Sequence, residues 1–316
     1  MRMDVAVAIP CFNSAKTIKD TIDDVLKQSF RDFELIVYDD GSTDNTAEIV
    51  HNISKDESRV RLYLGEKNRG RSAARNAAVA IAGNRLIAWQ DSDDLWHKEK
   101  LERQIAYYAK ASDVFCDDKI IITSPIKKIP PRGKSENDAT EFSYLYTSLY
   151  PPTVYDLDYI YSKDFTNCPF FLTTTLGPAE YYAHCGGFDE ELAWHEDLDI
   201  ALKLTTNGYR IVGHRYHEAL SYYYLSVPKT NSKVLEEALD FVTDKYAFFA
   251  KARGIDVNEY RIWRRHSYLF QTLVRKGDVH SALNLVVTDL QQAPLSKATI
   301  DQIRENLNKL CNGNER

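Results

Sequence analysis

The chain has 316 residues and a formal net charge of -6 at pH 7. Hydrophobic residues make up 44% and charged residues 27%, a composition that predicts a soluble globular protein with one large domain and an appendage. Nucleic-acid binding favours a basic excess, so this acidic chain is not expected to have a nucleic-acid partner.

The cysteines and the apolar runs predict a compartment. Five cysteines stand far apart, without the Cys-x-x-Cys spacing of a zinc or redox motif, which indicates a reducing environment. No signal-like segment precedes the first apolar run, and no run approaches the roughly 18 residues of a membrane span. We therefore expect a cytoplasmic protein, open to peripheral contact with the inner face of a membrane.

Strand-like and helix-like segments alternate through the first 122 residues. Strands are predicted at 5–9, 33–38, 60–64, 86–90 and 113–122, and helices at 17–28, 46–53, 72–81 and 98–109. This alternation is typical of an α/β, Rossmann-like fold with a mainly parallel sheet flanked by helices, whose ligands lie beyond the carboxyl ends of the strands.

A helical region follows residue 230. Candidate helices lie at 234–252, 257–276, 279–291 and 296–310, punctuated by glycine and proline. We divide the chain into residues 1–230 and a C-terminal helical appendage, residues 231–316, which serves packing or homo-oligomer formation.

The turn after the first strand lacks glycine, since the first glycine in the chain is Gly41. The glycine-rich dinucleotide turn and the P-loop are therefore both absent. The phosphates of a bound nucleotide would need a different cradle.

Three carboxylates, Asp91, Asp93 and Asp94, follow the predicted strand 86–90. Carboxylates this close repel each other unless a cation or a helix end compensates them. One or two protein carboxylates often hold Mg²⁺ or Mn²⁺, with substrate phosphates completing the shell. The segment therefore predicts a metal site for a diphosphate; the alternative is a turn that caps the helix beginning near His97.

Six segments stand in order, each at a strand end or a helix start. They are residues 9–13, 38–44, 68–76, 91–94, 186–190 and 196–197. Together they resemble the motif set of the family 2 glycosyltransferases, which have the GT-A fold, over about residues 4–225. The resemblance implies an inverting hexosyl- or N-acetylhexosaminyl-transferase that moves a sugar from a nucleotide-diphosphate donor to a hydroxyl of a glycan or lipid-linked acceptor, in the biosynthesis of cell-surface polysaccharide.

The resemblance also implies residue roles. Asp91 and Asp93 would hold Mn²⁺ or Mg²⁺, with Asp93 the preferred direct ligand. The donor nucleotide, for which UDP is favoured, would lie against Pro10, Phe12, Asn13, Asp40, Arg71 and Ser92. One of Arg71 and Arg75 would contact the donor, and the other would bridge to a carboxylate.

Asp197, with Glu196 beside it, would be the general base, since a helix N-terminus favours the ionised carboxylate. Trp194 and His195, just before them, would contact the acceptor. Candidates for a side chain that closes over the diphosphate are His214, His217 and Lys229.

Residues 123–165 interrupt the alternation. Four cations precede or enter a tyrosine-dense stretch; the cations are Lys127, Lys128, Arg132 and Lys134, and the tyrosines are Tyr144, Tyr146, Tyr150, Tyr155, Tyr159 and Tyr161. One interpretation is a variable insertion near the acceptor site, lying against a saccharide or an anionic membrane. The other is a surface excursion whose tyrosines are packed as core.

Two competing functions are less well supported. Residues 39–43 faintly resemble the aspartate turn of a phosphatase, but Tyr38 stands where the nucleophile would be. A catalytically inactive carbohydrate-binding or scaffold protein derived from a transferase would be signalled by loss of Asp93 or Asp197, and both are present.

Overall fold

A computed structural model describes residues 4–115, 119–130, 132, 148–149, 154–155, 171–214, 218–224, 231–252, 254–291 and 295–313. Contacts divide the chain into two compact units, the first made of residues 1–156, 168–192 and 196–225, and the second of residues 157–167, 193–195 and 226–316. Several residues named above lie outside the described ones: Lys134, Tyr144, Tyr146, Tyr150, Tyr159, Tyr161, His217 and Lys229.

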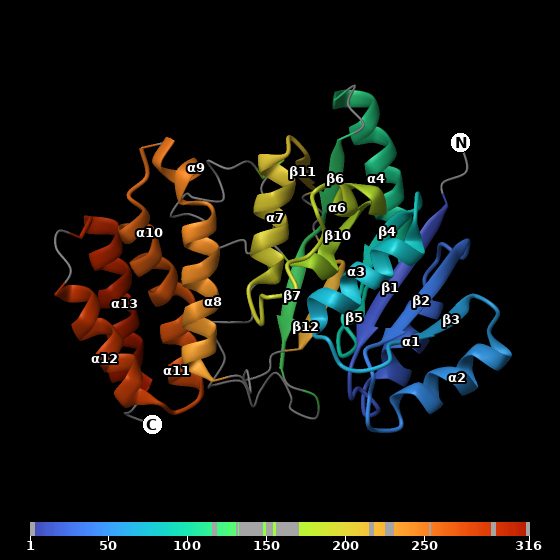
Figure 1. The fold of residues 1–316 in the computed structure, drawn as a ribbon, viewed down its shortest axis with the longest axis horizontal. Helices are drawn as coiled ribbons and strands as arrows, with labels where there is room; N and C mark the ends of the chain where they lie inside the picture. The colour runs from blue at the N-terminus through green and yellow to red at the C-terminus, as the bar shows by residue number, and fades with distance from the viewer. Residues whose placement is uncertain are drawn as a thin grey trace. The chain divides into compact units, whose positions relative to one another are not determined.

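The first unit is built around an eight-stranded sheet in the order β3-β2-β1-β4-β10-β6-β11-β9 (Figure 1). Its strands are β1 (Val5–Cys11), β2 (Phe33–Asp39), β3 (Val60–Leu64), β4 (Leu86–Trp89), β6 (Ile120–Thr123), β9 (Val154–Tyr155), β10 (Thr175–Pro178) and β11 (Arg210–Gly213). The pairs β1–β2, β1–β4, β2–β3 and β6–β11 are parallel, whereas β10 runs antiparallel between β4 and β6. The predicted mainly parallel α/β fold is confirmed.

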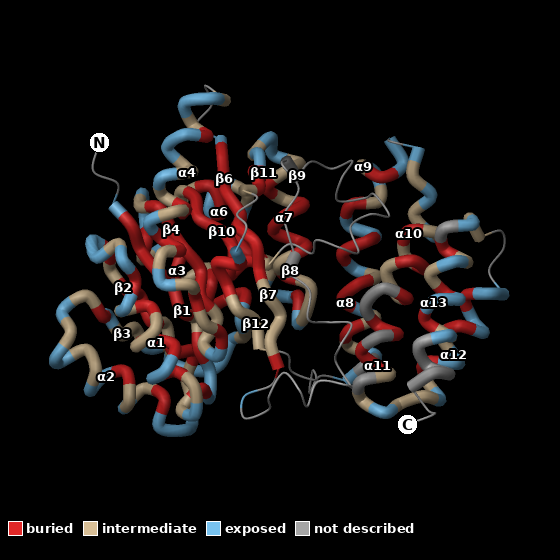
Figure 2. The backbone as a smooth tube through the Cα atoms, turned by 180° about the vertical axis from the view of Figure 1, so that it is seen from behind, coloured by how far each residue is buried: buried red, intermediate tan, exposed pale blue. Residues whose placement is uncertain are grey.

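Helices cover this sheet because each presents an apolar stripe to it. They are α1 (Ile18–Leu26), α2 (Thr46–Asp56), α3 (Arg71–Ala82), α4 (Lys100–Phe115), α6 (Ala179–His184) and α7 (Glu196–Thr206), with a 3-10 turn, η4 (Leu172–Thr174). In α1, for example, Ile18, Ile22 and Val25 recur at helical spacing and are fully buried. Figure 2 shows the central strands buried along most of their length.

A second, smaller sheet has the order β5-β12-β7-β8. Its strands are β5 (Leu95–Trp96), β7 (Ile126–Ile129), β8 (Ser148–Leu149) and β12 (Ser221–Tyr224). β12 pairs in parallel with β7, so that Tyr223 stands beside Lys128. Residues 126–129 are therefore regular strand, where the sequence led us to expect the start of an irregular insertion.

The predicted strand 113–122 is wrong in its first half. Helix α4 continues to Phe115, and β6 begins only at Ile120. The apolar pair Val114 and Phe115 suggested a strand, but Phe115 packs from the helix against the core while Val114 is exposed. Tertiary packing thus extends the helix through residues of good strand propensity.

The second unit is helical in its described residues after 230. Its helices are α8 (Ser232–Lys245), α9 (Ala247–Ala252), α10 (Val257–Arg264), α11 (Gln271–Arg275), α12 (Val279–Leu290) and α13 (Lys297–Gly313), with a π-helical turn at Arg265–Phe270. The helix predicted at 257–276 is interrupted by that turn. Buried within this unit, His266 Nε2 lies 3.1 Å from a carboxylate oxygen of Asp289. Among the described residues, no helix is long and apolar enough to cross a membrane.

Candidate active site

The turns that follow β1 and β2 are tied together by Asn13. Its Oδ1 accepts a hydrogen bond from the backbone N–H of Thr43 at 2.8 Å, and its own N–H donates to Ser42 Oγ at 2.8 Å. Asn13 has a left-handed backbone with φ 49°, a conformation that asparagine tolerates better than most residues. Phe12, beside it, is 42% exposed, which leaves an aromatic surface at the edge of the sheet.

Asp40 joins the end of β2 to the start of α3. Its carboxylate, only 3% exposed, accepts hydrogen bonds from the backbone N–H of Arg69 at 3.0 Å and of Gly70 at 2.8 Å. The adjacent Gly41 has φ 71°, and a Cβ there would lie 2.6 Å from the carbonyl carbon of Lys67. Glycine therefore allows the two turns to approach closely enough for Asp40 to reach α3.

The acidic turn, residues 91–94, extends from β4. Asp93 is exposed and the Asp91 side chain is 36% exposed, whereas Asp94 is buried and its Oδ1 accepts the N–H of Tyr224 at 2.9 Å. Burial and the charges of Asp91 and Asp93 raise the pKa of Asp94 well above its usual range. Asp94 therefore ties the acidic turn to β12.

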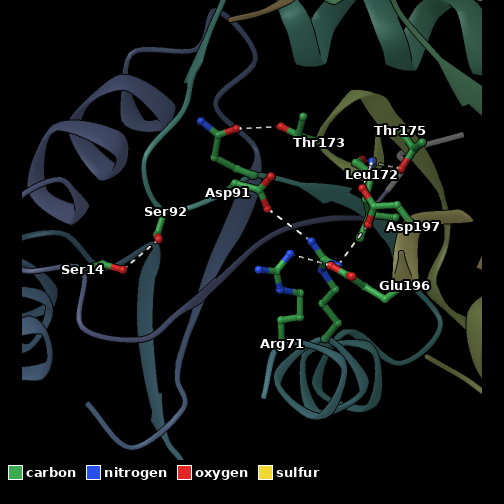
Figure 3. Close-up of polar contacts among 11 residues, drawn as sticks. Ser14, Arg71, Asp91, Ser92, Leu172, Thr173, Thr175, Glu196 and Asp197 are labelled. Atoms are coloured by element: carbon green, nitrogen blue, oxygen red, sulfur yellow. Dashed lines mark hydrogen bonds and ion pairs between the residues drawn. The ribbon is translucent and has the colours of Figure 1, made fainter. Parts of the chain in front are cut away.

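Ser92 connects the acidic turn to the turn after β1, since its hydroxyl lies 2.8 Å from that of Ser14 (Figure 3). Pro10, another residue predicted to contact the nucleotide, lies in β1 opposite Tyr38. The residues predicted for the donor nucleotide thus come from β1, β2, β4 and the turns after them. Arg71, at the first turn of α3, completes that set.

Arg75 links the acidic turn to the start of α7. Its guanidinium, 5% exposed, lies 2.7 Å from Glu196 Oε1, 3.0 Å from Asp197 Oδ1 and 3.4 Å from Asp91 Oδ1. Arg71 Nη1 donates to the same Glu196 oxygen at 3.0 Å. Figure 3 shows Asp91, Arg71, Glu196 and Asp197 converging on this network. Both arginines therefore bridge to carboxylates.

Asp197 stands in an environment that suits a base. Its Oδ2 accepts the backbone N–H of Leu172 at 3.2 Å, and its side chain is 28% exposed. Burial raises the pKa of Asp197 to about 6, against the lowering effect of Arg75 and with help from the charges of Glu196 and Asp91. Such a group is ionised at neutral pH yet basic enough to accept a proton.

Glu196 differs from its neighbour. Burial opposes ionisation, but Arg71 and Arg75 outweigh it and lower the pKa of Glu196 below its usual range. This carboxylate is 4% exposed and shared between two guanidinium groups. Glu196 therefore positions the arginines, and Asp197 is the better candidate for proton transfer.

The predicted segment 186–190 packs against α3. The side chain of Asn76 accepts the N–H of Phe188 at 2.7 Å and donates to its carbonyl at 2.9 Å. Gly187 has φ 71°, and a Cβ there would lie 2.6 Å from Asn76 Oδ1. The segment thereby holds the chain before α7 against the helix that carries Arg71 and Arg75.

Three predicted residues have other surroundings. Trp194 packs, partly buried, against the apolar core of the helical unit, and His195 has φ 63° immediately before α7. The His214 ring lies edge-on to Tyr107, with centroids 4.1 Å apart, and its backbone N–H donates to Thr123. The acceptor role of Trp194 and His195 and the diphosphate role of His214 stay predictions without support from these contacts.

The oxygen-rich turn suits a hard divalent cation. Among the described residues, no group of three or more His, Cys, Asp or Glu side chains could hold a metal by itself. Asp91 and Asp93 instead offer two accessible carboxylates beside the buried Asp94. That donor set fits Mn²⁺ or Mg²⁺ completed by substrate phosphates.

The sequence profile of glycosyl transferase family 2 matches residues 6–172, more than half of the chain. A putative teichuronic acid biosynthesis glycosyltransferase, TuaG of Bacillus subtilis, is 40% identical over 111 residues, covering 35% of this chain and 44% of TuaG. WfgD of Escherichia coli, a UDP-Glc:alpha-D-GlcNAc-diphosphoundecaprenol beta-1,3-glucosyltransferase, is 42% identical over 106 residues, covering 34% of this chain and 41% of WfgD. The aligned stretches thus span less than half of either relative.

Solved structures share the fold. TarS 1-349 of S. aureus in complex with UDP-GlcNAc has a TM-score of 0.60 at 20% identity, covering 98% of this chain and 92% of that one. The mannosyltransferase PcManGT from Pyrobaculum calidifontis, in complex with GDP-Man and Mn²⁺, has a TM-score of 0.56 at 18% identity, covering 98% of this chain and 81% of that one. At these identities the likeness concerns the fold.

Proposed function

Because the chain belongs to glycosyl transferase family 2, we propose that it transfers a sugar from a nucleotide-diphosphate donor to a hydroxyl group of a saccharide acceptor. The observation that carries this proposal is that Arg75 contacts both Asp91 of the acidic turn and Asp197, the candidate base. A transferase needs a place for the leaving diphosphate and a base for the incoming hydroxyl. This network brings candidates for both together.

The donor is proposed to be a UDP-sugar. The turns after β1 and β2 offer Phe12, Asn13 and Asp40 to the nucleotide, and a fold neighbour was solved with UDP-GlcNAc. Asp91 and Asp93 would hold Mn²⁺ or Mg²⁺, which supplies Lewis-acid stabilisation of the charge on the leaving diphosphate. A second fold neighbour was solved with Mn²⁺.

The reaction is proposed to invert the anomeric carbon. The acceptor oxygen bonds to that carbon while the bond to the diphosphate oxygen breaks, and the nucleotide diphosphate leaves with the electron pair. Asp197 takes the hydroxyl proton. An in-line attack assisted by one base gives the opposite anomeric configuration.

The acceptor is proposed to be a glycan or a lipid-linked saccharide in surface-polysaccharide biosynthesis. The names of TuaG and WfgD, which concern teichuronic acid and an undecaprenol-linked acceptor, support this class. Action on such acceptors would place the protein in the cytoplasm, at the inner face of the membrane.

Two measurements test the proposal. Purified protein is incubated with Mn²⁺ and a panel of UDP- and GDP-sugars, and release of the nucleotide diphosphate is followed; the Asp197→Asn variant serves as the control. Proton NMR of the product then gives its anomeric configuration. Retention of the donor configuration would contradict the inverting mechanism, and no turnover of any donor would favour the inactive binding protein.

A further inference from the structure

Two aromatic rings and a lysine gather at Phe171, the residue that precedes Leu172. The rings of Phe171 and Tyr223 have centroids 5.5 Å apart, and Lys128 Nζ lies 5.8 Å from the centre of the Phe171 ring. These three residues come from the chain before η4, from β12 and from β7. All three are partly exposed, so this aromatic cluster retains accessible surface.

The cluster is fixed to both halves of the site. Phe171 immediately precedes Leu172, whose N–H donates to Asp197 at 3.2 Å. Tyr223 immediately precedes Tyr224, whose N–H donates to Asp94 at 2.9 Å. Phe171 is therefore the sequence neighbour of a residue that binds the candidate base, and Tyr223 is the sequence neighbour of a residue that binds the acidic turn.

The register of the second sheet places a second tyrosine–lysine pair on the face opposite to this cluster. Tyr223 pairs with Lys128, and Tyr222 pairs with Lys127. Successive side chains of a strand point to opposite faces, so Tyr222 and Lys127 lie on the other face. One face carries a tyrosine–lysine pair beside Phe171, and the other carries a pair of the same composition.

Aromatic faces and an ammonium group together suit a sugar that carries a negative charge. Partly exposed rings offer flat apolar surface to the C–H faces of a sugar, and an ammonium group attracts an anionic substituent. A hydroxyl that reacts at Asp197 must belong to a molecule extending onto neighbouring surface. The aromatic cluster provides such surface within one residue of the base contact.

From this arrangement, and resting on the proposed transferase function, we infer that Phe171, Tyr223 and Lys128 form the acceptor subsite. The subsite takes a saccharide that carries an anionic group, either phosphate or carboxylate. The rings hold the sugar, and Lys128 holds the anionic substituent.

The test measures sugar binding by the full chain in the presence of UDP and Mn²⁺. The probes are N-acetylglucosamine 1-phosphate, the methyl glycoside of glucuronic acid, and neutral methyl glucoside and methyl N-acetylglucosaminide, followed by saturation-transfer NMR titration. We expect at least one anionic sugar to bind about tenfold more tightly than its neutral counterpart. Tighter binding of the phosphate or of the carboxylate probe shows which anionic group of the acceptor the subsite recognises.

Matched variants locate the effect. Lys128→Met should abolish the preference for anionic sugars, whereas Lys127→Met, on the opposite face, should keep it. Phe171→Leu and Tyr223→Leu should each lower the binding affinity for every sugar about tenfold. Tyr222→Leu should leave the affinity for each sugar unchanged. The leucine variants retain apolar bulk, and unchanged UDP affinity in calorimetry shows that each variant is folded at the donor site.

Three results would overturn the inference: equal binding of anionic and neutral sugars, equal effects of the matched variants on the two faces, or no sugar binding by protein that still binds UDP. Failure of the unmodified protein to bind either UDP or GDP in the presence of Mn²⁺ would instead overturn the proposed function, and the inference with it.

Discussion

The acidic turn and the start of α7 each concentrate carboxylates, but they balance the charge differently. At α7, Glu196 and Asp197 are met by Arg75, and Glu196 also by Arg71, at 2.7–3.0 Å. At the acidic turn, the one ion pair between side chains that the described residues show is the longer Arg75–Asp91 contact at 3.4 Å. The first cluster carries its counter-ions in the chain, whereas the second is the cluster that we propose to take a divalent cation from solution.

The difference suggests separate roles for the two clusters, proton transfer at α7 and metal binding at the acidic turn. Fixed guanidinium groups hold a carboxylate in one orientation, as proton transfer requires. A divalent cation held by Asp91 and Asp93 would instead be shared with the phosphates of the substrate, which complete its coordination shell. Four experiments would break or sharpen this comparison.

The largest effect is expected at the base. Asp197→Asn keeps the shape of the side chain and removes its basicity, so turnover should fall by ~100- to 10,000-fold. UDP binding in the presence of Mn²⁺ should stay within a factor of about two, because the change leaves the acidic turn intact. Calorimetry and a nucleotide-release assay measure the two quantities, and near-normal turnover would move the base elsewhere, first to Glu196.

The fixed counter-ion should matter most for stability. Arg75→Met leaves buried Glu196 with Arg71 alone, and breaking a buried ion pair costs about 3–5 kcal/mol of unfolding free energy. Arg69, near the same helix start, is 61% exposed and pairs with Glu190, so Arg69→Met should cost only ~0–1 kcal/mol. Urea unfolding in metal-free buffer at pH 7 measures both; equal losses would mean that Arg75 is not a structural counter-ion.

The diffusible counter-ion should matter for the donor. Asp93→Ala should weaken UDP binding in Mn²⁺ by at least about tenfold and leave binding in EDTA unchanged. Asp23 of α1, whose side chain is 38% exposed and pairs with Lys19, provides the control, since Asp23→Ala removes one negative charge without touching the acidic turn. Undiminished dependence on Mn²⁺ in the Asp93 variant would place the metal elsewhere.

The smallest effect concerns pH. Because the pKa of Asp197 in the ligand-free protein is raised to about 6, its proton must be lost before it can act, and kcat/KM should fall about tenfold per unit below pH 6. The folded-state pKa lies above the ordinary value near 4, so the stability that the proton brings is present below pH ~4 and lost as the pH rises through 6. Asp197→Asn should remove this change in unfolding free energy between pH ~4 and 6. A rate profile that falls only near pH 4 would contradict the raised pKa.

Much of the first unit could be predicted because local pattern and tertiary packing agree there. From β1 to α3 the period of the apolar residues gives each element within a few residues. The second sheet could not be predicted, since β5 has two residues and β7 and β12 have four each. Strands this short carry too little alternation to be recognised, and β7 pairs with a partner far along the chain.

The same reasoning separates the predicted from the missed parts of the site. Asp40 and Asp91 follow strands whose carboxyl ends share one edge of a sheet, so their proximity follows from topology. The buried pairing of Arg75 with both Glu196 and Asp197 depends on how α7 packs, which local pattern does not encode. The N–H of Leu172 carried no signal at all, because almost every residue has one.

The contact between Asp40 and the start of α3 limits which substitutions this chain can accept during evolution. The same carboxylate that we propose to contact the donor nucleotide also accepts hydrogen bonds from the N–H groups of Arg69 and Gly70 at the start of α3. A substitution that altered nucleotide preference at this position would also loosen the helix that carries Arg71 and Arg75. Changes in nucleotide preference and in the arginine network are therefore expected to occur together.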